Sequence, residues 1–183
     1  MSARDEILAA VRASGPPHVD RPDSGGFPIA SSDVVTDFVA ALEATGGRAV
    51  RVESDAELPD RIRDLVGQKG HVVAPVDIGV RDLDTVEVAV VRARLGVAEN
   101  GAVWLSEADL GARVLPVIVP CLIVVLDADT IVSTMNEAYA ALEGDMPGFG
   151  QFVAGPSKTA DIEQSLVIGA HGARETTVVL VGV

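Results

Sequence analysis

The sequence predicts an α/β protein, a single-domain, three-layer αβα fold with a mainly parallel sheet. Apolar residues make up 48% of the 183 residues and aromatic residues only 3%, so the core must be built from Val, Leu, Ile and Ala. Such a core suits parallel sheets, whose buried strands are near-continuous aliphatic runs. Segments with helical apolar spacing also alternate with short aliphatic segments, which is the pattern of βαβ units.

The first part of the chain is expected to lie outside the folded domain. Ile7, Leu8 and Val11 have helical spacing and predict a helix over residues 3–13. The stretch that follows is rich in Gly and Pro, a composition typical of a linker. We therefore divide the chain into an N-terminal helix and linker, residues 1–30, and one folded domain, residues 31–183.

The first half of this domain alternates helical and strand patterns. Ser32 or Asp33 can cap the first helix, and Gly46-Gly47 ends it. Pro75 stops the second strand. The elements expected are a helix to about residue 45, a strand over 48–52, a helix over 55–66, a strand over 71–74 and a turn over 81–85.

The second half contains the most aliphatic segment of the chain, residues 122–126, which predicts a buried strand. Other strands are expected over 86–91, 102–105, 151–154 and 176–181. Helices are expected over 107–115 and 127–142, an irregular or short helical connection over 92–97, and a glycine-rich loop over 144–150.

Charge and composition exclude several classes of function. The net charge of −13 opposes binding to nucleic acid or to an anionic membrane. The start of the sequence lacks the apolar core of a signal peptide, and the longest uncharged apolar run, residues 114–126, is too short to span a bilayer. We expect a cytoplasmic protein without membrane insertion.

No cofactor is evident from the sequence. One cysteine, Cys121, cannot form a disulfide framework or a cysteine-ligated iron–sulfur site, and its aliphatic neighbours predict a buried thiol. Neither the glycine-rich dinucleotide-binding motif nor a phosphate loop is present.

Residues 155–163 form the first candidate site, with the composition of a strand-to-helix elbow. Gly155 permits a close backbone approach, and Ser157 or Thr159 can cap a helix. The free N–H groups of such a helix start, the two hydroxyls and the ammonium of Lys158 together suit an anion. The alternative is an ordinary capped helix with a solvated Lys158.

Three further polar residues are candidates for a supporting role around this anion site. Asp161 and Glu163 stand two positions apart on the predicted helix and face different ways, so we reject a metal site formed by them with His171. His171 lies between glycines after the predicted helix, where a structural role is favoured over catalysis.

Glu99-Asn100-Gly101 is the second candidate site. The Asn-Gly pair is a strong turn signal, so Glu99 is expected at the edge of a strand. A carboxylate there can act as nucleophile, general base or hydrogen-bond acceptor, and Asn100 and Gly101 can contact a ligand. A purely structural turn is the alternative.

Two segments resemble the LUD domain family, also known from lactate-utilisation protein C. Residues 155–172, Gly-Pro-Ser-Lys-Thr-Ala-Asp-Ile-Glu through Gly-Ala-His-Gly, are similar to the C-terminal signature of that family. Residues 97–105 resemble its Ala-Glu-Thr-Gly-Thr segment, with Asn100 and Ala102 in place of the two threonines. The resemblance covers roughly residues 85–183 and implies a fold related to the NagB/RpiA/CoA-transferase group.

The resemblance implies an accessory subunit in the oxidation of L-lactate to pyruvate, working with a cysteine-rich subunit and an iron–sulfur subunit and binding a small anion. Glu-Asn-Gly is also similar to the tripeptide of class I coenzyme A transferases, whose glutamate attacks a thioester. The alternatives are therefore a stand-alone transferase or sugar-phosphate isomerase that uses Glu99, or a module for protein interaction alone. Ligands of open α/β sheets gather at the carboxyl ends of strands, so we expect Glu99 and Ser157 to share one cleft there.

Overall fold

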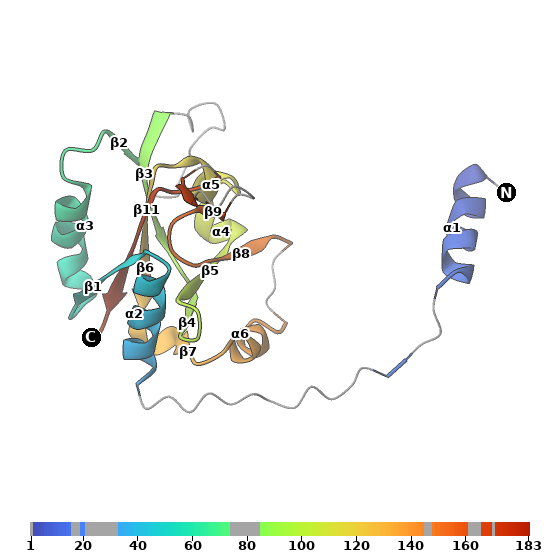
Figure 1. Cartoon of the computed structure of the whole chain (residues 1–183), viewed down its shortest axis with the longest axis horizontal. Coiled ribbons are helices and arrows are strands. Elements are labelled where there is room, and N and C mark those ends of the chain that lie inside the picture. The colour runs from blue at the N-terminus through green and yellow to red at the C-terminus, as the bar shows by residue number, and fades with distance from the viewer. Residues whose placement is uncertain are drawn as a thin grey trace.

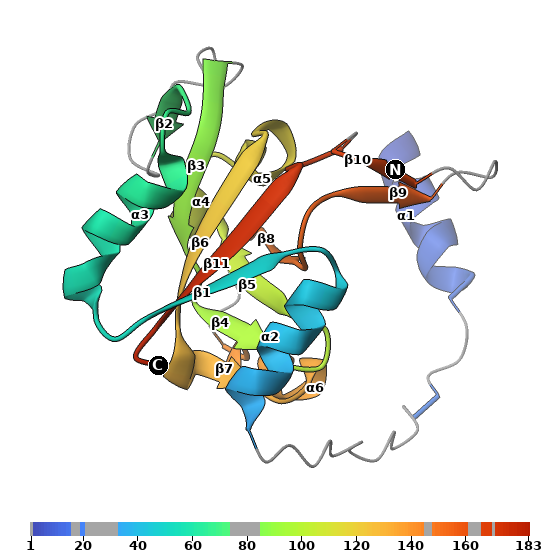
Figure 2. The same ribbon diagram turned by 60° about the vertical axis from the view of Figure 1, so that its left-hand side comes forward.

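A five-stranded parallel sheet, sheet A, forms the centre of the fold (Figure 2). The computed structural model describes residues 2–15, 19–20, 33–73, 85–144, 148–160, 166–169 and 171–183. The strand order is β1-β11-β6-β3-β2. The strands are β1 (Arg48–Val52), β2 (His71–Val73), β3 (Val86–Arg92), β6 (Cys121–Asp127) and β11 (Glu175–Val181).

Strands β6 and β11 form the core of sheet A because their side chains are aliphatic on both faces. Leu122, Val124 and Leu126 face one side and Ile123 and Val125 the other, all at most 4% exposed. The two strands pair in parallel along their whole length. Sheet A is therefore covered on both faces, as parallel sheets usually are.

Helix α3 (Leu58–Val66), preceded by the short 3-10 helix η1 (Asp55–Glu57), covers one face of sheet A (Figure 1). Its apolar residues, Ile62 and Leu65 among them, pack against Ile123 and Val179. Pro at the second helical position suits the start of this helix, where a backbone donor has no partner.

Helix α2 (Val34–Ala44) covers part of the opposite face, beside a second sheet (Figure 1). The Asp33 carboxylate caps the helix by accepting hydrogen bonds from the N–H groups of Val35 and Thr36. Phe38 and Leu42 are completely buried between the helix and the sheets.

The second sheet, sheet B, has the order β7-β4-β5-β8 and was not expected from the sequence. Its strands are β4 (Leu95–Val97), β5 (Ala102–Ser106), β7 (Ile131–Val132) and β8 (Gly150–Val153). Leu105 and Val153 pack towards sheet A. Trp104 and Phe152 point to the other face, where they meet helix α6 (Met135–Ala141).

The remaining elements are helix α1 (Ala3–Ala13) and several short ones: α4 (Glu107–Leu110), α5 (Leu115–Ile118), the 3-10 helix η3 (Ala128–Thr130), and the antiparallel pair β9 (Lys158–Ala160) and β10 (Leu166–Ile168). Helix α1 buries none of its residues. No helix in the described part of the chain is both long and apolar enough to pass through a bilayer.

The predicted α/β class, with a mainly parallel sheet flanked by helices, is confirmed. The predicted helices over 3–13, about 33–45 and 55–66 are confirmed, as are the predicted strands that became β1, β3, β5, β6, β8 and β11. The strand predicted over 71–74 is seen as β2, and residue 74 lies outside the described residues.

Three predicted connections and helices were wrong. Residues 95–97 form strand β4, because they pair with both β5 and β7. The single helix predicted over 127–142 is η3, strand β7 and helix α6, since Ile131 and Val132 pair with β4 and Thr134 caps a new helix. The helix predicted over 107–115 ends at Leu110, before Gly111, and α5 starts separately.

Several predictions lie outside the described residues. These are most of the linker, the turn over 81–84, and residues 145–147 of the glycine-rich loop.

Candidate functional site

The predicted strand-to-helix elbow at residues 155–163 was wrong. Gly155 and Pro156 form a bend, and residues 158–160 continue as strand β9, which pairs with β10 (Figure 2). Thr159 pairs with Val167 and Lys158 with Ile168. β-Branched residues at these positions favour a strand, so no helix N-terminus is present at Ser157 to bind an anion.

Ser157 instead connects the β9–β10 pair to the loop before β11 through backbone hydrogen bonds. Its N–H donates to the carbonyl of Ala173 at 2.8 Å, and its carbonyl accepts from Gly169 at 2.9 Å. A Cβ on Gly172 would lie 3.0 Å from the Ser157 Cβ. The predicted site residues Ser157 and His171 are therefore brought together by two loops that hydrogen-bond to each other.

These loops border a cavity of about 280 Å³ between sheets A and B. Its polar lining consists of Gln151, Ser157, Lys158, His171 and Thr176. Its apolar lining includes Pro116, Val117, Leu122 and Val153. Because Leu122 and Thr176 stand at the starts of β6 and β11, the cavity lies at the amino ends of these strands.

The ionisable side chains in the lining of this cavity are basic residue types. Lys158 and His171 line it, and no aspartate or glutamate does so among the described residues. The chain as a whole carries a net charge of −13, so this absence of carboxylates differs from its general composition. A small anion can approach such a lining without meeting a like charge at close range.

Lys158 also lies against the end of helix α2. A Cβ on Gly46 would come within 3.2 Å of the Lys158 Nζ, and one on Gly155 within 2.4 Å of the Thr45 Oγ1. The last turn of α2 has no basic residue of its own. The ammonium of Lys158 therefore complements the negative end of the helix dipole while it borders the cavity.

Glu99 does not line this cavity, so the predicted shared cleft with Ser157 is not seen in the structure. Glu99 Oε1 accepts a hydrogen bond from the Met135 N–H at 3.0 Å, at the start of α6. Asn100 Oδ1 accepts from the Ala102 N–H at 3.0 Å, which closes the turn. Gly101 has φ +66° and rests on the backbone of α2, where an added Cβ would lie 2.4 Å from the Leu42 nitrogen.

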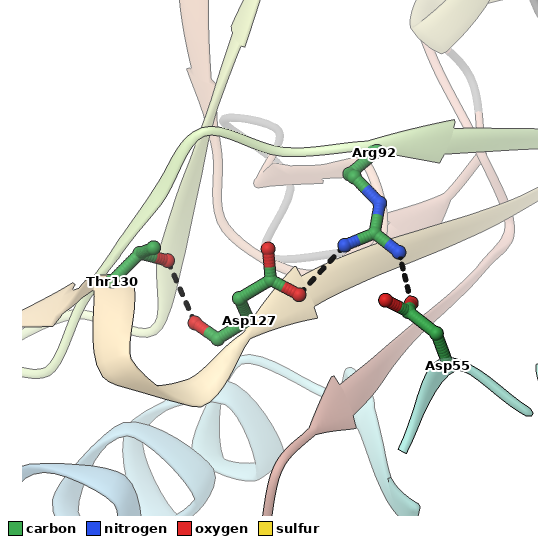
Figure 3. A network of polar contacts seen from close by, with 4 residues as sticks. All are labelled: Asp55, Arg92, Asp127 and Thr130. Carbon is green, nitrogen blue, oxygen red and sulfur yellow. Dashed lines mark hydrogen bonds and ion pairs between the residues drawn. The ribbon is translucent and has the colours of Figure 1, made fainter.

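At the carboxyl ends of β3 and β6, Arg92 joins two aspartates (Figure 3). Its guanidinium donates to Asp127 at 2.6 Å and also to Asp55. Partial burial opposes the charge of Arg92, but these hydrogen bonds outweigh it and raise the pKa of the guanidinium. Two carboxylates already neutralise the one cation, so this edge of the sheet is a poor anion site.

A second cavity, of about 260 Å³, lies at the amino end of β6. Its lining includes Lys69, Glu87, Cys121, Arg174 and Glu175, so cationic and anionic side chains balance. Lys69 Nζ donates to Glu175 at 2.5 Å and lies 3.4 Å from the Cys121 Sγ. Burial raises the pKa of the Cys121 thiol, against the smaller opposing effect of Lys69.

Two polar residues of the first cavity were not predicted as site residues from the sequence, Gln151 and Thr176. Both are polar residues paired with a core leucine of the neighbouring strand, and that inward-facing position was the available signal. They line one cavity only because the two sheets stack on each other, and the sequence pattern did not reveal that stacking.

The other predicted site residues divide into two groups. Thr159 is part of strand β9, and Gly155 lines the cavity. Asp161 and Glu163 lie outside the described residues.

Within the described ranges, no group of three or more His, Cys, Asp or Glu side chains is arranged to hold a metal ion.

Comparison with known proteins gives one family. The family model described as LUD domain matches residues 80–181 of this chain. A solved structure of a DUF162 family protein from Deinococcus radiodurans superposes with a TM-score of 0.64 over 85% of this chain and 100% of the other, at 23% identity. At that identity the likeness concerns the fold.

The curated relatives include proteins named lactate utilization protein C. That of Shouchella clausii is 30% identical over 98 residues, which are 51% of this chain and 43% of the relative. That of Geobacillus kaustophilus is 28% identical over 61% of this chain and 50% of the relative. The chain thus spans about half the length of these two, and 82% of that of Deinococcus radiodurans, which is 28% identical over 85% of this chain.

Proposed function

Because this chain belongs to the LUD domain family, we propose that it is an accessory subunit of L-lactate utilisation that binds a small anion beside Lys158. It would act with a cysteine-rich subunit and an iron–sulfur subunit, which carry the redox step. The names of the relatives support the pathway. The single cysteine supports the division of labour, because four thiolates are the usual ligands of an iron–sulfur cluster.

The observation that carries anion binding is the lining of the 280 Å³ cavity. It contains a lysine, a histidine and a serine and, among the described residues, no carboxylate. The volume is at the small end of ligand cavities, so it suits a molecule of a few heavy atoms. A carboxylate bound to Lys158 would gain a charge-assisted hydrogen bond.

Calorimetric titration of the purified protein with L-lactate, pyruvate, coenzyme A and a sugar phosphate tests this proposal. We expect a small carboxylate to bind and Lys158→Met to weaken it at least about tenfold, the value of one charge-assisted hydrogen bond of about 1.5 kcal/mol. Lys69→Met is the matched control, since Lys69 is the other lysine and lines the other cavity. The anion site would be contradicted if none of these anions bound, or if Lys158→Met and Lys69→Met lowered the affinity equally.

The accessory role has its own test. We expect the protein to co-elute in size-exclusion chromatography with cysteine-rich and iron–sulfur subunits when the three are produced together. Lactate oxidation should then require all three. Full oxidation without this chain would contradict the accessory role and leave the anion site to be judged by titration.

A further inference from the structure

The aromatic side chains of this protein gather at one place. The whole chain has one tryptophan, one tyrosine and four phenylalanines. A cavity of about 460 Å³ is lined by the tryptophan, the tyrosine and two of the phenylalanines, Trp104, Tyr139, Phe149 and Phe152. A protein with an otherwise aliphatic core therefore places most of its few aromatic rings around a single cavity.

This cavity lies on the face of sheet B that is turned away from sheet A. Trp104 of β5 and Phe152 of β8 are paired across the strands, so they share this face. Tyr139 comes from helix α6, which packs on the same face. Trp104 is 5% exposed and Tyr139 is 51% exposed. The tryptophan therefore belongs to the floor of the cavity and the tyrosine to its accessible rim.

The rings are inclined to one another. The Phe152 centroid lies 4.6 Å from that of Trp104, with 52° between the ring planes. It lies 5.7 Å from that of Tyr139, with 64° between the planes. Neither pair is parallel, so these rings do not form the flat slot into which a planar molecule would slide. Inclined rings around a hollow suit a compact, rounded group instead.

The charges around the rings favour a cation. Among the described residues, no charged side chain lines the cavity. One ring already attracts a cation, because the guanidinium carbon of Arg113 lies 5.1 Å from the centroid of Phe149. Glu107 binds the same guanidinium at 2.7 and 2.9 Å, so this charge is balanced. The net charge of −13 also attracts cations and repels anions.

We infer that the 460 Å³ cavity binds a small organic cation, an alkylated ammonium of the choline type, against the rings of Tyr139, Phe149 and Phe152. Alkyl groups on the nitrogen contact the rings, while the positive charge is attracted by the negative faces of their π-systems. The volume is within the usual range of small-molecule sites. This site is separate from the proposed anion site beside Lys158, and neither depends on the other.

Fluorescence titration tests the inference, because Trp104 is the only tryptophan and lines the cavity. The two probes are choline and dimethylbutanol, its neutral analogue in which a carbon atom replaces the nitrogen. We expect choline to bind at least about tenfold more tightly, since several rings act on its charge together. Calorimetric titration with the same two probes measures the ratio independently of the fluorescence.

Variants of Tyr139 separate the rings from the net charge of the protein. Tyr139→Leu removes one ring from an exposed position, so the fold should persist and the preference for choline should fall at least about threefold. Tyr139→Phe is the matched control, because it keeps the ring, and its preference should stay within about twofold of the wild type. Both variants leave the net charge unchanged.

The remaining outcomes overturn the inference. Equal affinity for choline and dimethylbutanol would show an apolar cavity without preference for a cation. No binding of choline to the folded protein would show that the rings serve packing alone. A preference for choline that persists in both Tyr139→Leu and Phe149→Leu would place the cation elsewhere on the acidic surface.

Discussion

Replacing Gly101 with alanine should destabilise the protein more than any other substitution in the Glu99-Asn100-Gly101 turn. Gly101 has φ +66°, in the left-handed region, and it lies directly against the last turn of α2. A Cβ there would approach the nitrogen of Leu42 to 2.4 Å and the carbonyl carbon of Ala41 to 2.9 Å. These are backbone atoms of a helix, which cannot rotate away as a side chain could.

The expected cost has two parts. The left-handed conformation costs an alanine about 1–2 kcal/mol relative to glycine. Forcing α2 to move away costs roughly a further 1–3 kcal/mol, as in other overpacked sites. For a chain of this size each kcal/mol lowers the midpoint temperature by about 2–4 °C, so the total corresponds to a fall of roughly 4–20 °C.

Gly144→Ala separates the two parts. Gly144 has φ +86°, and nothing lies within 4 Å of its added Cβ, so only the conformational cost applies. Urea unfolding of both variants should show Gly101→Ala less stable than Gly144→Ala by at least about 1 kcal/mol. Equal losses would refute the close packing of this turn on α2, and with it the structural role assigned to Gly101.

Two further predictions concern Glu99 and Cys121. Glu99→Gln keeps an oxygen that accepts from the Met135 N–H, so we expect its free energy of unfolding in urea to change by no more than about 0.5 kcal/mol and its lactate titration to be unchanged. We also expect mass spectrometry of the wild-type protein incubated with acyl-CoA to show no acyl adduct. An adduct on Glu99 would support the transferase hypothesis instead. Because burial raises the pKa of Cys121 above the ordinary 9.0, less thiolate is present at pH 9 than in a free thiol, and iodoacetamide should modify the native protein at least about tenfold more slowly than the urea-unfolded protein. Equal rates would contradict the burial of Cys121.

The helices and strands that were predicted correctly are those whose own apolar pattern and capping residues identify them without reference to neighbouring elements. The stripe of Phe38 and Leu42 with the cap Asp33 predicts α2, and the aliphatic run around Ile123 predicts β6 without knowledge of neighbours. Strands β4, β7, β9 and β10 are two or three residues long and depend on partners. Their stability comes from pairing across the sheet, which a linear pattern does not contain.

The candidate site was predicted in part for the same reason. Ser157, Lys158 and His171 were selected by composition and do line one cavity, although the helix invoked for them is a strand. Glu99 was placed beside them because ligands usually lie at the carboxyl ends of strands, and the cavity lies at the amino ends. Thr176 lines this cavity only because sheet B stacks on sheet A, and a linear pattern does not contain that stacking.

Strand β11 has a consequence for how this protein is made. It lies between β1 and β6, and it pairs with β1 across more than a hundred residues of sequence. Such distant pairing is slow, because a long loop must close before the contact is gained. During synthesis β1 therefore has no neighbour in the sheet until β11 leaves the ribosome. Since Thr176 arrives on that same strand, the closing of sheet A and the completion of the cavity wall are one event.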